Sequence, residues 1–349
     1  MILAGDIGGT KTVLALIDEA HPSATPGPQV APGGPGYPAL QIVKETIFHG
    51  AEFPSLEAIL EQFLGPDDRT ALGAACFGVA GPVENGTAHI TNLPWTIDAA
   101  VLSGRLGGIP VALLNDLQAT ALGILVLPDT AFAVLQPDPS PAPPGSTIAV
   151  IAPGTGLGEA LLVSDGTHYR ALPSEGGHAD FAPNSDEEIE LLRFLRGRHG
   201  PHVSYERALS GAAIGDVYDF VRHATGAAEP AWLTEQIAGH DRNAVISKAA
   251  LEHRDPTCVH TLEIFVDMLG AEAGNLALRG MAAGGVVIGG GIPPKILPAL
   301  QQPRLIERFN AKGRLSSFTR NLAVRVALEP RAALFGAAHH AAIQKETRP

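Results

Sequence analysis

The sequence predicts an α/β fold of two lobes with a cleft between them. At 349 residues, the chain is longer than one small hydrophobic core requires. A strand pattern, a glycine-rich turn and a second strand pattern occur near the N-terminus and again after residue 146. This internal repeat indicates two related lobes, and the alternation of strand and helix patterns is typical of α/β folds. Clefts between lobes are favoured ligand sites, so we expect the functional residues to face one.

Composition and charge exclude several classes of protein. Hydrophobic residues make up 45% of the chain and charged residues 17%, which is typical of a chain that folds. The formal net charge of −12 gives no general attraction for nucleic acid or anionic membranes. Without a basic N-terminal region or an apolar run of about 20 residues, we expect a cytoplasmic protein. Cys76 and Cys258 are expected to be buried free thiols.

Patterns in the first half predict a hairpin followed by further strands and helices. Residues 2–18 are expected to form a strand, a turn at Gly8-Gly9 and a second strand. Apolar residues at helical spacing predict a helix at 54–64. Segment 21–38 is rich in proline and glycine and cannot bury a core, so we expect a mobile surface loop there. The other expected elements are strands at 40–47, 72–79 and 111–114 and a helix at 117–127.

The second half repeats the opening of the first and then becomes mainly helical. A second proline-rich stretch, 136–145, separates the two halves. Strand patterns at 147–151 and 159–163 flank another glycine-rich turn. The other expected elements are mostly helices over 186–280, a short strand at 286–288 and an alanine-rich helix at 332–344.

The first glycine-rich turn, residues 6–12, is a candidate phosphate site. Glycine permits positive φ and a close approach of backbone to a ligand, and successive N–H groups in such a turn bind anions. Thr10 and Thr12 add hydroxyl donors. Asp6 could hold Mg²⁺ or its coordinated water, because hard cations prefer oxygen ligands. A tight hairpin with an incidental aspartate remains an alternative from this segment alone.

Two further glycine loops lie in the second half. The turn Gly154-Thr155-Gly156-Leu157-Gly158 resembles a dinucleotide fingerprint, but a strand pattern follows it where a Rossmann site requires a helix. One such turn is a weak signal, whereas two, one in each half, could hold a polyphosphate across a cleft. The loop Gly289-Gly290-Gly291 follows a strand and suits close packing against a flat ligand such as adenine. Its alternative is an ordinary strand–helix turn.

A polar pair, Asn115 and Asp116, ends an apolar strand and precedes a helix. A carboxylate there could accept the proton of an attacking hydroxyl, which is usually worth about 10²–10⁴ in rate. Asn115 can both donate to and accept from neighbouring hydroxyl groups. The alternative is that Asp116 merely caps the following helix.

Polar residues also gather around Gly176-Gly177, between Glu175 and His178. A carboxylate that accepts two hydrogen bonds matches vicinal hydroxyls, and a neutral imidazole can bond a third. The alternative is a turn with a surface glutamate and a satisfied histidine. Glu206, by itself, looks like an ordinary residue at the start of a helix.

The motifs, in the order in which they occur along the chain, resemble those of bacterial glucokinases of the enteric type, which belong to the superfamily of sugar kinases, actin and heat-shock chaperones. The resemblance spans nearly the whole chain and implies two ribonuclease H-like (actin-like ATPase) lobes, with the C-terminal helix returning to the first. It implies a small α/β lobe of residues 1–126 plus 330–349 and a large α/β lobe of residues 127–329. The motifs are Asp6–Thr12, Gly78–Pro82, Leu114–Asp116, Gly154–Gly158, Ser174–Phe181, Ser204–Gly211 and Gly289–Gly291.

The resemblance implies ATP-dependent phosphorylation of D-glucose at its 6-hydroxyl, with ATP and Mg²⁺ and a homodimeric protein. It implies that Asp116 is the catalytic base, and only the resemblance raises Glu206 above an ordinary helix start. The implied glucose-binding residues are Asn115, Asp116, Glu175, His178 and Glu206. The implied nucleotide-binding residues are Gly5, Asp6, Ile7, Gly8, Gly9, Thr10, Gly154, Thr155, Gly156, Gly158, Gly289, Gly290 and Gly291.

Other functions remain open from the sequence. A kinase for another hexose or an amino sugar would use the same machinery, because one hydroxyl's stereochemistry can decide specificity. A non-catalytic sensor of actin-like fold predicts loss of Asp116 or of a phosphate loop, and both are present. A filament-forming or chaperone ATPase has no need of Glu175 and His178 together. Polyphosphate or ADP as the phosphoryl donor also remains open.

Overall fold

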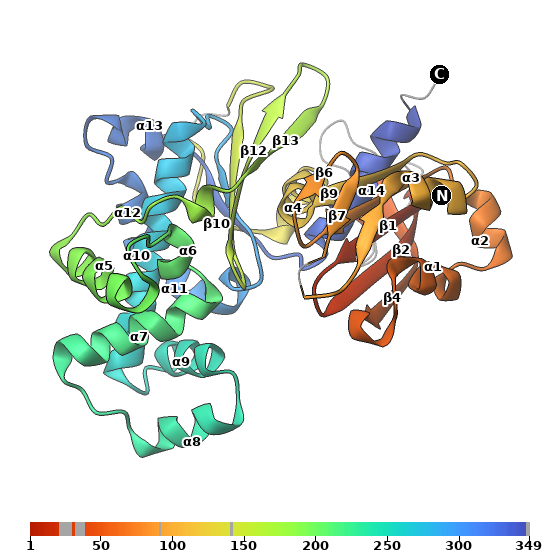
Figure 1. The fold of residues 1–349 in the computed structure, drawn as a ribbon. Coiled ribbons are helices and arrows are strands. Elements are labelled where there is room, and N and C mark those ends of the chain that lie inside the picture. Colours follow the sequence, from red (N-terminus) through yellow and green to blue (C-terminus); the bar gives the residue numbers. More distant parts are fainter. Residues whose placement is uncertain (21–29, 32–38, 91, 140–141, 347–349) are drawn as a thin grey trace. The chain divides into compact units, whose positions relative to one another are not determined.

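The computed structural model describes residues 1–20, 30–31, 39–90, 92–139 and 142–346 (Figure 1). The expected loop 21–38 therefore lies outside the described residues, except for Val30–Ala31. None of the described helices is both long enough and apolar enough to span a membrane. The chain divides into two compact units: unit 1 is Met1–Phe132, Asp165–Pro173 and Glu329–Pro349, and unit 2 is Ala133–Ser164 and Ser174–Leu328.

The sheet of unit 1 is built on the predicted N-terminal hairpin. Its strand order is β3-β4-β2-β1-β5-β9, with β1 antiparallel to β2 and parallel to β5. All six residues of β5 are buried, as expected of a strand inside a partly parallel sheet. The strands are β1 (Ile2–Ile7), β2 (Lys11–Ala20), β3 (Val30–Ala31), β4 (Ala39–His49), β5 (Ala74–Val79) and β9 (Val111–Asn115).

Two helices of unit 1 that are distant in the sequence cross at very short range. A Cβ atom on Gly336 of α14 would lie 1.7 Å from the Ala119 carbonyl oxygen of α4, so only glycine fits there. A small antiparallel sheet, β6-β7-β8, completes unit 1. Its strands are β6 (Val83–Glu84), β7 (Thr87–His89) and β8 (Thr96–Asp98). The helices are η1 (Gly50–Glu52), α1 (Leu56–Phe63), α2 (Pro66–Ala71), α3 (Ala99–Arg105), α4 (Asp116–Ile124), η2 (Asp129–Ala131) and α14 (Ala332–Glu346).

The sheet of the second half repeats the first. Its order is β10-β15-β14-β11-β12-β13; β11 is antiparallel to β12 and parallel to β14, and β14 is parallel to β15. In unit 1, β5 is likewise parallel to the first strand of the hairpin, β1, and β9 is parallel to β5. The predicted internal repeat and α/β class are thus confirmed. The strands are β10 (Phe132–Gln136), β11 (Ile148–Pro153), β12 (Leu157–Ser164), β13 (Tyr169–Ser174), β14 (Val286–Ile288) and β15 (Val324–Ala327).

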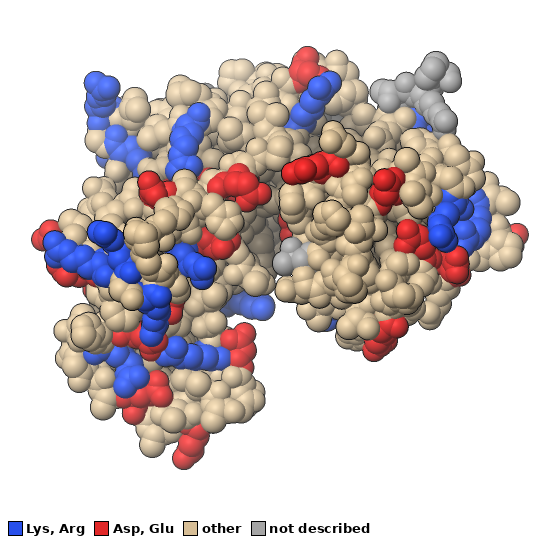
Figure 2. Space-filling model, viewed as in Figure 1, with Lys and Arg blue, Asp and Glu red and all other residues tan. Residues whose placement is uncertain are grey.

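Helices supply most of unit 2, as the sequence predicts for 186–280. Acidic and basic side chains lie interspersed over them on the face shown in Figure 2. Each unit has its own hydrophobic core, and the 24-residue helix α10 contributes heavily to that of unit 2. The helices are η3 (Gly176–His178), α5 (Asp186–His199), α6 (Tyr205–Ala208), α7 (Gly211–Thr225), α8 (Ala231–Gly239), α9 (Arg242–Leu251), α10 (Pro256–Arg279), η4 (Pro293–Ile296), α11 (Leu297–Leu300), α12 (Pro303–Asn310), η5 (Gly313–Leu315) and α13 (Ser316–Arg320).

The two cysteines behave as predicted. Cys76 lies in β5 and Cys258 in α10, and both are buried and free. Burial raises the pKa of the Cys258 thiol to about 12, so neither a reactive thiolate nor a disulfide is expected there.

Candidate active site

Parallel strands bring the candidate carboxylates of unit 1 to one edge of the sheet. Asp6 of β1 pairs with Gly78 of β5, which in turn pairs with Leu114 of β9, and helix α4 begins at Asp116. The carboxyl ends of these strands therefore meet where α4 starts. Burial, and then the negative charge of Asp116, raise the pKa of Asp6 to about 6, as expected where two carboxyls lie at the same edge of a sheet.

Gly78 makes this arrangement possible. A Cβ atom at that position would lie 2.8 Å from the Ala119 side chain and 3.9 Å from the Asp116 Cα. Without that atom, α4 can approach β5 closely. From the sequence, Gly78 is only one residue of the motif Gly78–Pro82, and no role is predicted for it.

The residue that caps α4 is Asn115, so the alternative of Asp116 as the cap is wrong. Asn115 Oδ1 accepts from the Leu117 N–H at 3.0 Å, and Asn115 Nδ2 donates to the Gly81 carbonyl at 3.1 Å. Asp116 is the first helical residue; it is exposed, and its Oδ1 accepts from Leu117 N–H at 2.8 Å. The positive end of the helix dipole favours an ionised carboxylate at this position.

The first glycine turn is closed by a hydrogen bond from Gly8 N–H to the Lys11 carbonyl at 2.9 Å. Thr10 is exposed, whereas Thr12 is fully buried, so the expected role of Thr12 as a hydroxyl donor to phosphate is wrong. Gly5 is a packing residue: a Cβ atom there would lie 2.5 Å from Phe77. Positive φ is not used by the glycines of this turn, so that expectation is also wrong.

Unit 2 brings its two glycine loops together. Because β14 lies beside β11, the loop after β14 lies next to the turn after β11, and Gly289 N–H donates to the Ile151 carbonyl at 2.8 Å. A Cβ atom on Gly290 would lie 2.6 Å from the Pro153 carbonyl, and this residue has a φ of 87°. Gly211, at the start of α7, donates to the Gly154 carbonyl at 2.7 Å. The backbone around Gly154 is thus fixed from two sides.

Glu206 is joined directly to the second glycine turn. Its Oε2 accepts from Leu157 N–H at 3.0 Å, and a Cβ atom on Gly156 would lie 2.3 Å from that oxygen. Glycine at 156 therefore leaves the space that the carboxylate occupies. Both Gly156 and Glu206 are predicted site residues, but no pattern in the sequence predicts that they contact each other.

Glu175 and His178 lie at the two ends of η3. Glu175 Oε2 and His178 Nε2 are 3.8 Å apart, and the side chains are 82% and 60% exposed, so both remain accessible to a polar ligand. Tyr205 N–H donates to the Ala179 carbonyl at 2.9 Å, which joins α6 to η3. In unit 2, the structure therefore brings together Glu175, His178, Glu206 and the glycine turn.

The carboxylates of unit 1 are compatible with a magnesium ion. No group of three or more His, Cys, Asp or Glu side chains is arranged to hold a metal among the residues that the structure describes. Mg²⁺ in nucleotide enzymes commonly takes only one or two carboxylates and completes its shell with water and substrate phosphates. The interacting pair Asp6 and Asp116 fits that donor set.

Comparisons with known proteins agree over nearly the full length. Residues 3–344 match the Glucokinase family. The glucokinase of Nostoc punctiforme is 39% identical over 351 residues, which cover 97% of this chain and 98% of that protein.

Solved structures give the same result. A glucokinase from an Antarctic psychrotroph superposes with a TM-score of 0.83 at 32% identity, covering 98% of both chains. A Streptomyces griseus glucokinase of the ROK family, solved with glucose and AMPPNP, has a TM-score of 0.60 at 20% identity and covers 98% of this chain and 99% of its own. At that identity the likeness concerns the fold alone.

Proposed function

Since the chain belongs to the glucokinase family, it is an ATP-dependent hexose kinase, and we propose that Asp116 is the general base for phosphorylation of D-glucose at its 6-hydroxyl. The observation that carries this proposal is the position of Asp116. It is an exposed carboxylate at the N-terminus of α4, and it interacts with Asp6 at the carboxyl edge of the sheet. A base must be ionised before it accepts a proton, and the helix dipole favours that state.

In the proposed reaction, the glucose 6-hydroxyl loses its proton to a carboxylate oxygen of Asp116 as its oxygen attacks the γ-phosphorus of ATP. The bond from phosphorus to the bridging oxygen breaks, and ADP leaves. Asn115, Glu175, His178 and Glu206 hold the sugar hydroxyls. The transition state of such transfers is loose, so most of the rate comes from positioning and charge neutralisation.

The glycine loops are proposed to bind the nucleotide. Residues 5–10 and 154–158 would offer the phosphates backbone N–H groups other than those of Gly8, Gly154 and Leu157, which bond within the protein. Gly289–Gly291 would pack against the adenosine. Asp6 would hold Mg²⁺ through a coordinated water, which leaves Asp116 to act as the base. When bound, that ion would neutralise negative charge on the phosphates. From the family resemblance we also propose a cytosolic location and a homodimer.

Substitution Asp116→Asn tests the base. It keeps the size of the side chain but removes the acceptor charge, so the turnover rate should fall at least about 10²-fold in a folded protein. The measurement is a coupled assay of ADP release. Asp67→Asn is the matched control, because Asp67 is also an exposed carboxylate in the first turn of a unit 1 helix, α2. Near-normal turnover of Asp116→Asn would reject Asp116 as the base.

A panel of hexoses in the same assay tests the substrate. Glucose should have the highest kcat/KM, with Glu175→Gln raising mainly the glucose KM because a carboxylate accepts hydroxyl bonds more strongly than an amide. A higher kcat/KM for another hexose or an amino sugar would replace glucose in the proposal and leave the chemistry in place. Turnover with polyphosphate or ADP in place of ATP would revise the donor.

A further inference from the structure

Two buried carboxyl side chains, held by a partly exposed arginine, lie beneath the sugar-binding segment of unit 2. Glu159 of β12 and Glu272 of α10 both have fully buried side chains, at 0% exposed. Arg279 contacts both, with its Nη1 3.2 Å from Glu159 Oε2 and its Nη2 bonded to Glu272 Oε1. The second oxygen of Glu159, Oε1, is buried and has no hydrogen-bond partner among the described residues. The proposed reaction uses none of these groups.

The carboxyl of Glu159 lies directly against the backbone that carries the sugar-binding residues. A Cβ atom on Gly176 would lie 2.1 Å from Glu159 Oε2 and 2.9 Å from its Cδ. Gly176 follows Glu175 and begins η3, which ends at His178. The Ser174 hydroxyl accepts from Gly176 N–H at 3.0 Å and lies near the same point. A displacement of the Glu159 carboxyl would therefore displace this backbone.

A second contact connects the group to Glu206. Asn275 Nδ2 donates to Glu272 Oε2 at 2.9 Å and to the Tyr205 hydroxyl at 3.2 Å. Tyr205 immediately precedes Glu206 in α6. Two separate connections thus run from the buried carboxyl pair to the side chains expected to hold glucose.

Burial and the charge of Glu272 raise the pKa of Glu159 far above its ordinary value, although Arg279 opposes the rise. A proton on Glu159 would let it donate to Glu272, where two ionised carboxylates would repel. The other titratable groups nearby are Lys312, Tyr205, Arg308 and Glu188, of which Tyr205 is neutral because burial raises the pKa of its hydroxyl. Of these, Lys312 donates to Asn275 Oδ1 at 2.7 Å, and burial lowers its pKa to about 8.

We propose that Glu159 is a positioning residue for glucose binding: while protonated, it holds the segment Glu175–His178 in place, and on losing its proton it displaces that segment. This inference rests on the proposed function, because it concerns the same sugar site. An additional negative charge in a buried group is costly unless it gains a partner, and displacement of the overlying segment at Gly176 would admit water to the carboxylate and relieve that cost. The KM for glucose should therefore rise with pH, and it should rise more than the KM for ATP, because the displaced segment Glu175–His178 carries sugar-binding residues.

The substitution Glu159→Gln tests this inference. Glutamine keeps the shape and remains neutral at every pH, so it imitates the protonated carboxyl. Between about pH 6.5 and about pH 9, the glucose KM of the wild type should rise at least about five-fold and that of the variant less than about two-fold. Glucose affinity from calorimetric titration should show the same contrast. A variant whose profile runs parallel to that of the wild type overturns the proposal, and would assign the titration to Lys312 or another group.

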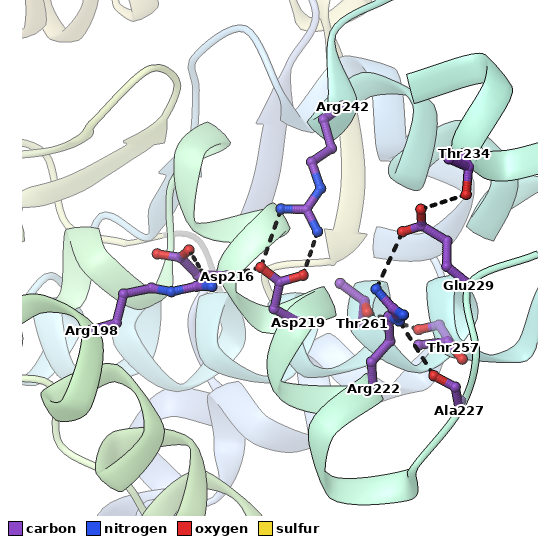
Figure 3. A network of polar contacts seen from close by, with 10 residues as sticks. All are labelled: Arg198, Asp216, Asp219, Arg222, Ala227, Glu229, Thr234, Arg242, Thr257 and Thr261. Carbon is purple, nitrogen blue, oxygen red and sulfur yellow. Dashed lines mark hydrogen bonds and ion pairs between the residues drawn. The ribbon is translucent and has the colours of Figure 1, made fainter. Parts of the chain in front are cut away.

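Asp219→Asn is the matched control. Asp219 is also a carboxylate of unit 2 held by arginines, with Oδ2 2.9 Å from Arg198 Nη1 and 3.2 Å from Arg242 Nη1 (Figure 3). Hydrogen bonds from these arginines keep its pKa below the ordinary value, so it stays ionised across the tested range. This variant should lose stability but keep the wild-type pH profile of the glucose KM. If Asp219→Asn also abolished the rise of the glucose KM with pH, a general loss of rigidity would explain the behaviour of both variants, and the proposal would fail.

Thermal unfolding gives a readout that is independent of catalysis. Because the folded protein binds the proton of Glu159 more tightly than the unfolded chain, wild-type stability should fall as pH rises from the ordinary carboxyl range to the raised pKa. In Glu159→Gln that fall should be smaller. An equal fall in both proteins contradicts the assignment of the proton to Glu159.

The wild type alone already distinguishes the two proposals. An enzyme that phosphorylates no glucose at any pH rejects the proposed function. An active enzyme whose glucose KM stays flat over the tested range rejects only the role of Glu159. If Glu159→Gln does not fold, Glu272→Gln should also flatten the pH profile of the glucose KM. Without the charge of Glu272, the pKa of Glu159 falls toward its ordinary value, and Glu159 stays ionised across the tested range.

Discussion

The position of the Glu206 side chain depends on the absence of a Cβ atom at Gly156. The Glu206 carboxylate occupies the space that this Cβ atom would fill, and it accepts a hydrogen bond from Leu157 N–H at 3.0 Å. A side chain expected to bind the sugar thus stabilises the turn expected to bind phosphate. The Glu206 side chain and the turn 154–158 both lie in unit 2 and are hydrogen-bonded to each other, so a displacement of one should displace the other.

Gly156→Ala should disturb both ligands. The added methyl group would lie 2.3 Å from Glu206 Oε2, which must move and release its bond to Leu157 N–H. We expect the glucose KM and the ATP KM each to rise at least about ten-fold, a cost of about 1.4 kcal/mol each. Steady-state kinetics with each substrate varied in turn measures both.

Gly154→Ala separates the two effects. Nothing lies within 4 Å of a Cβ atom at Gly154, so this variant should keep wild-type stability and change the ATP KM more than the glucose KM. If Gly156→Ala left the glucose KM unchanged, the contact with Glu206 would have no part in sugar binding.

Among the elements, α4 and α14 depend on each other most directly. Gly123 of α4 faces the Ala332 carbonyl, at 1.8 Å from where its Cβ atom would be, and Gly336 of α14 faces Ala119 in the same way. Asp116 begins α4, so the C-terminal helix supports the helix that carries the proposed base. Close packing of this kind resists added volume.

Gly336→Ala should destabilise unit 1. Its methyl group would overlap the Ala119 carbonyl at 1.7 Å, and overpacking of this kind costs about 1–3 kcal/mol or more. Gly104→Ala is the control: Gly104 lies in α3 of the same unit with nothing within 4 Å, so alanine should stabilise by roughly 0.5–1 kcal/mol. Denaturant unfolding measures both changes. Equal stability of the two variants would contradict the close crossing of α4 and α14.

Among the residues that the structure describes, each unit has a hydrophobic core of its own, around β5 and α1 in unit 1 and around α10 in unit 2. Each core is built almost entirely from residues of its own unit. Two-state unfolding is an approximation that suits small single domains and often fails for chains with more than one core.

Scanning calorimetry should therefore show unfolding that is not two-state. The measured calorimetric enthalpy should exceed the van't Hoff enthalpy, because the two cores need not melt together. Gly336→Ala should shift mainly one part of the transition, since it acts in unit 1. A single transition with equal enthalpies, moving as a whole, would show that the cores unfold cooperatively.

Local patterns in the sequence were sufficient for the regular core elements. The hairpins at 2–18 and 147–163, the strands around 74–79 and 111–115 and the final helix lie within a few residues of their predicted ranges. The reason is that strand and helix periodicity are properties of consecutive residues. Short elements with no strong period, such as α2, α3, β13 and α13, were not predicted.

Contacts between residues that are distant in the sequence could not be predicted from local patterns and are seen only in the tertiary structure. Asn115, rather than Asp116, caps α4; this choice depends on backbone geometry and on the Gly81 carbonyl, 34 residues away. Glu159 has the sequence context of an ordinary strand residue, yet its buried carboxyl pairs with Arg279, 120 residues later. No local pattern records such a pairing, because its energy comes from burial and from charges that meet only in the folded chain.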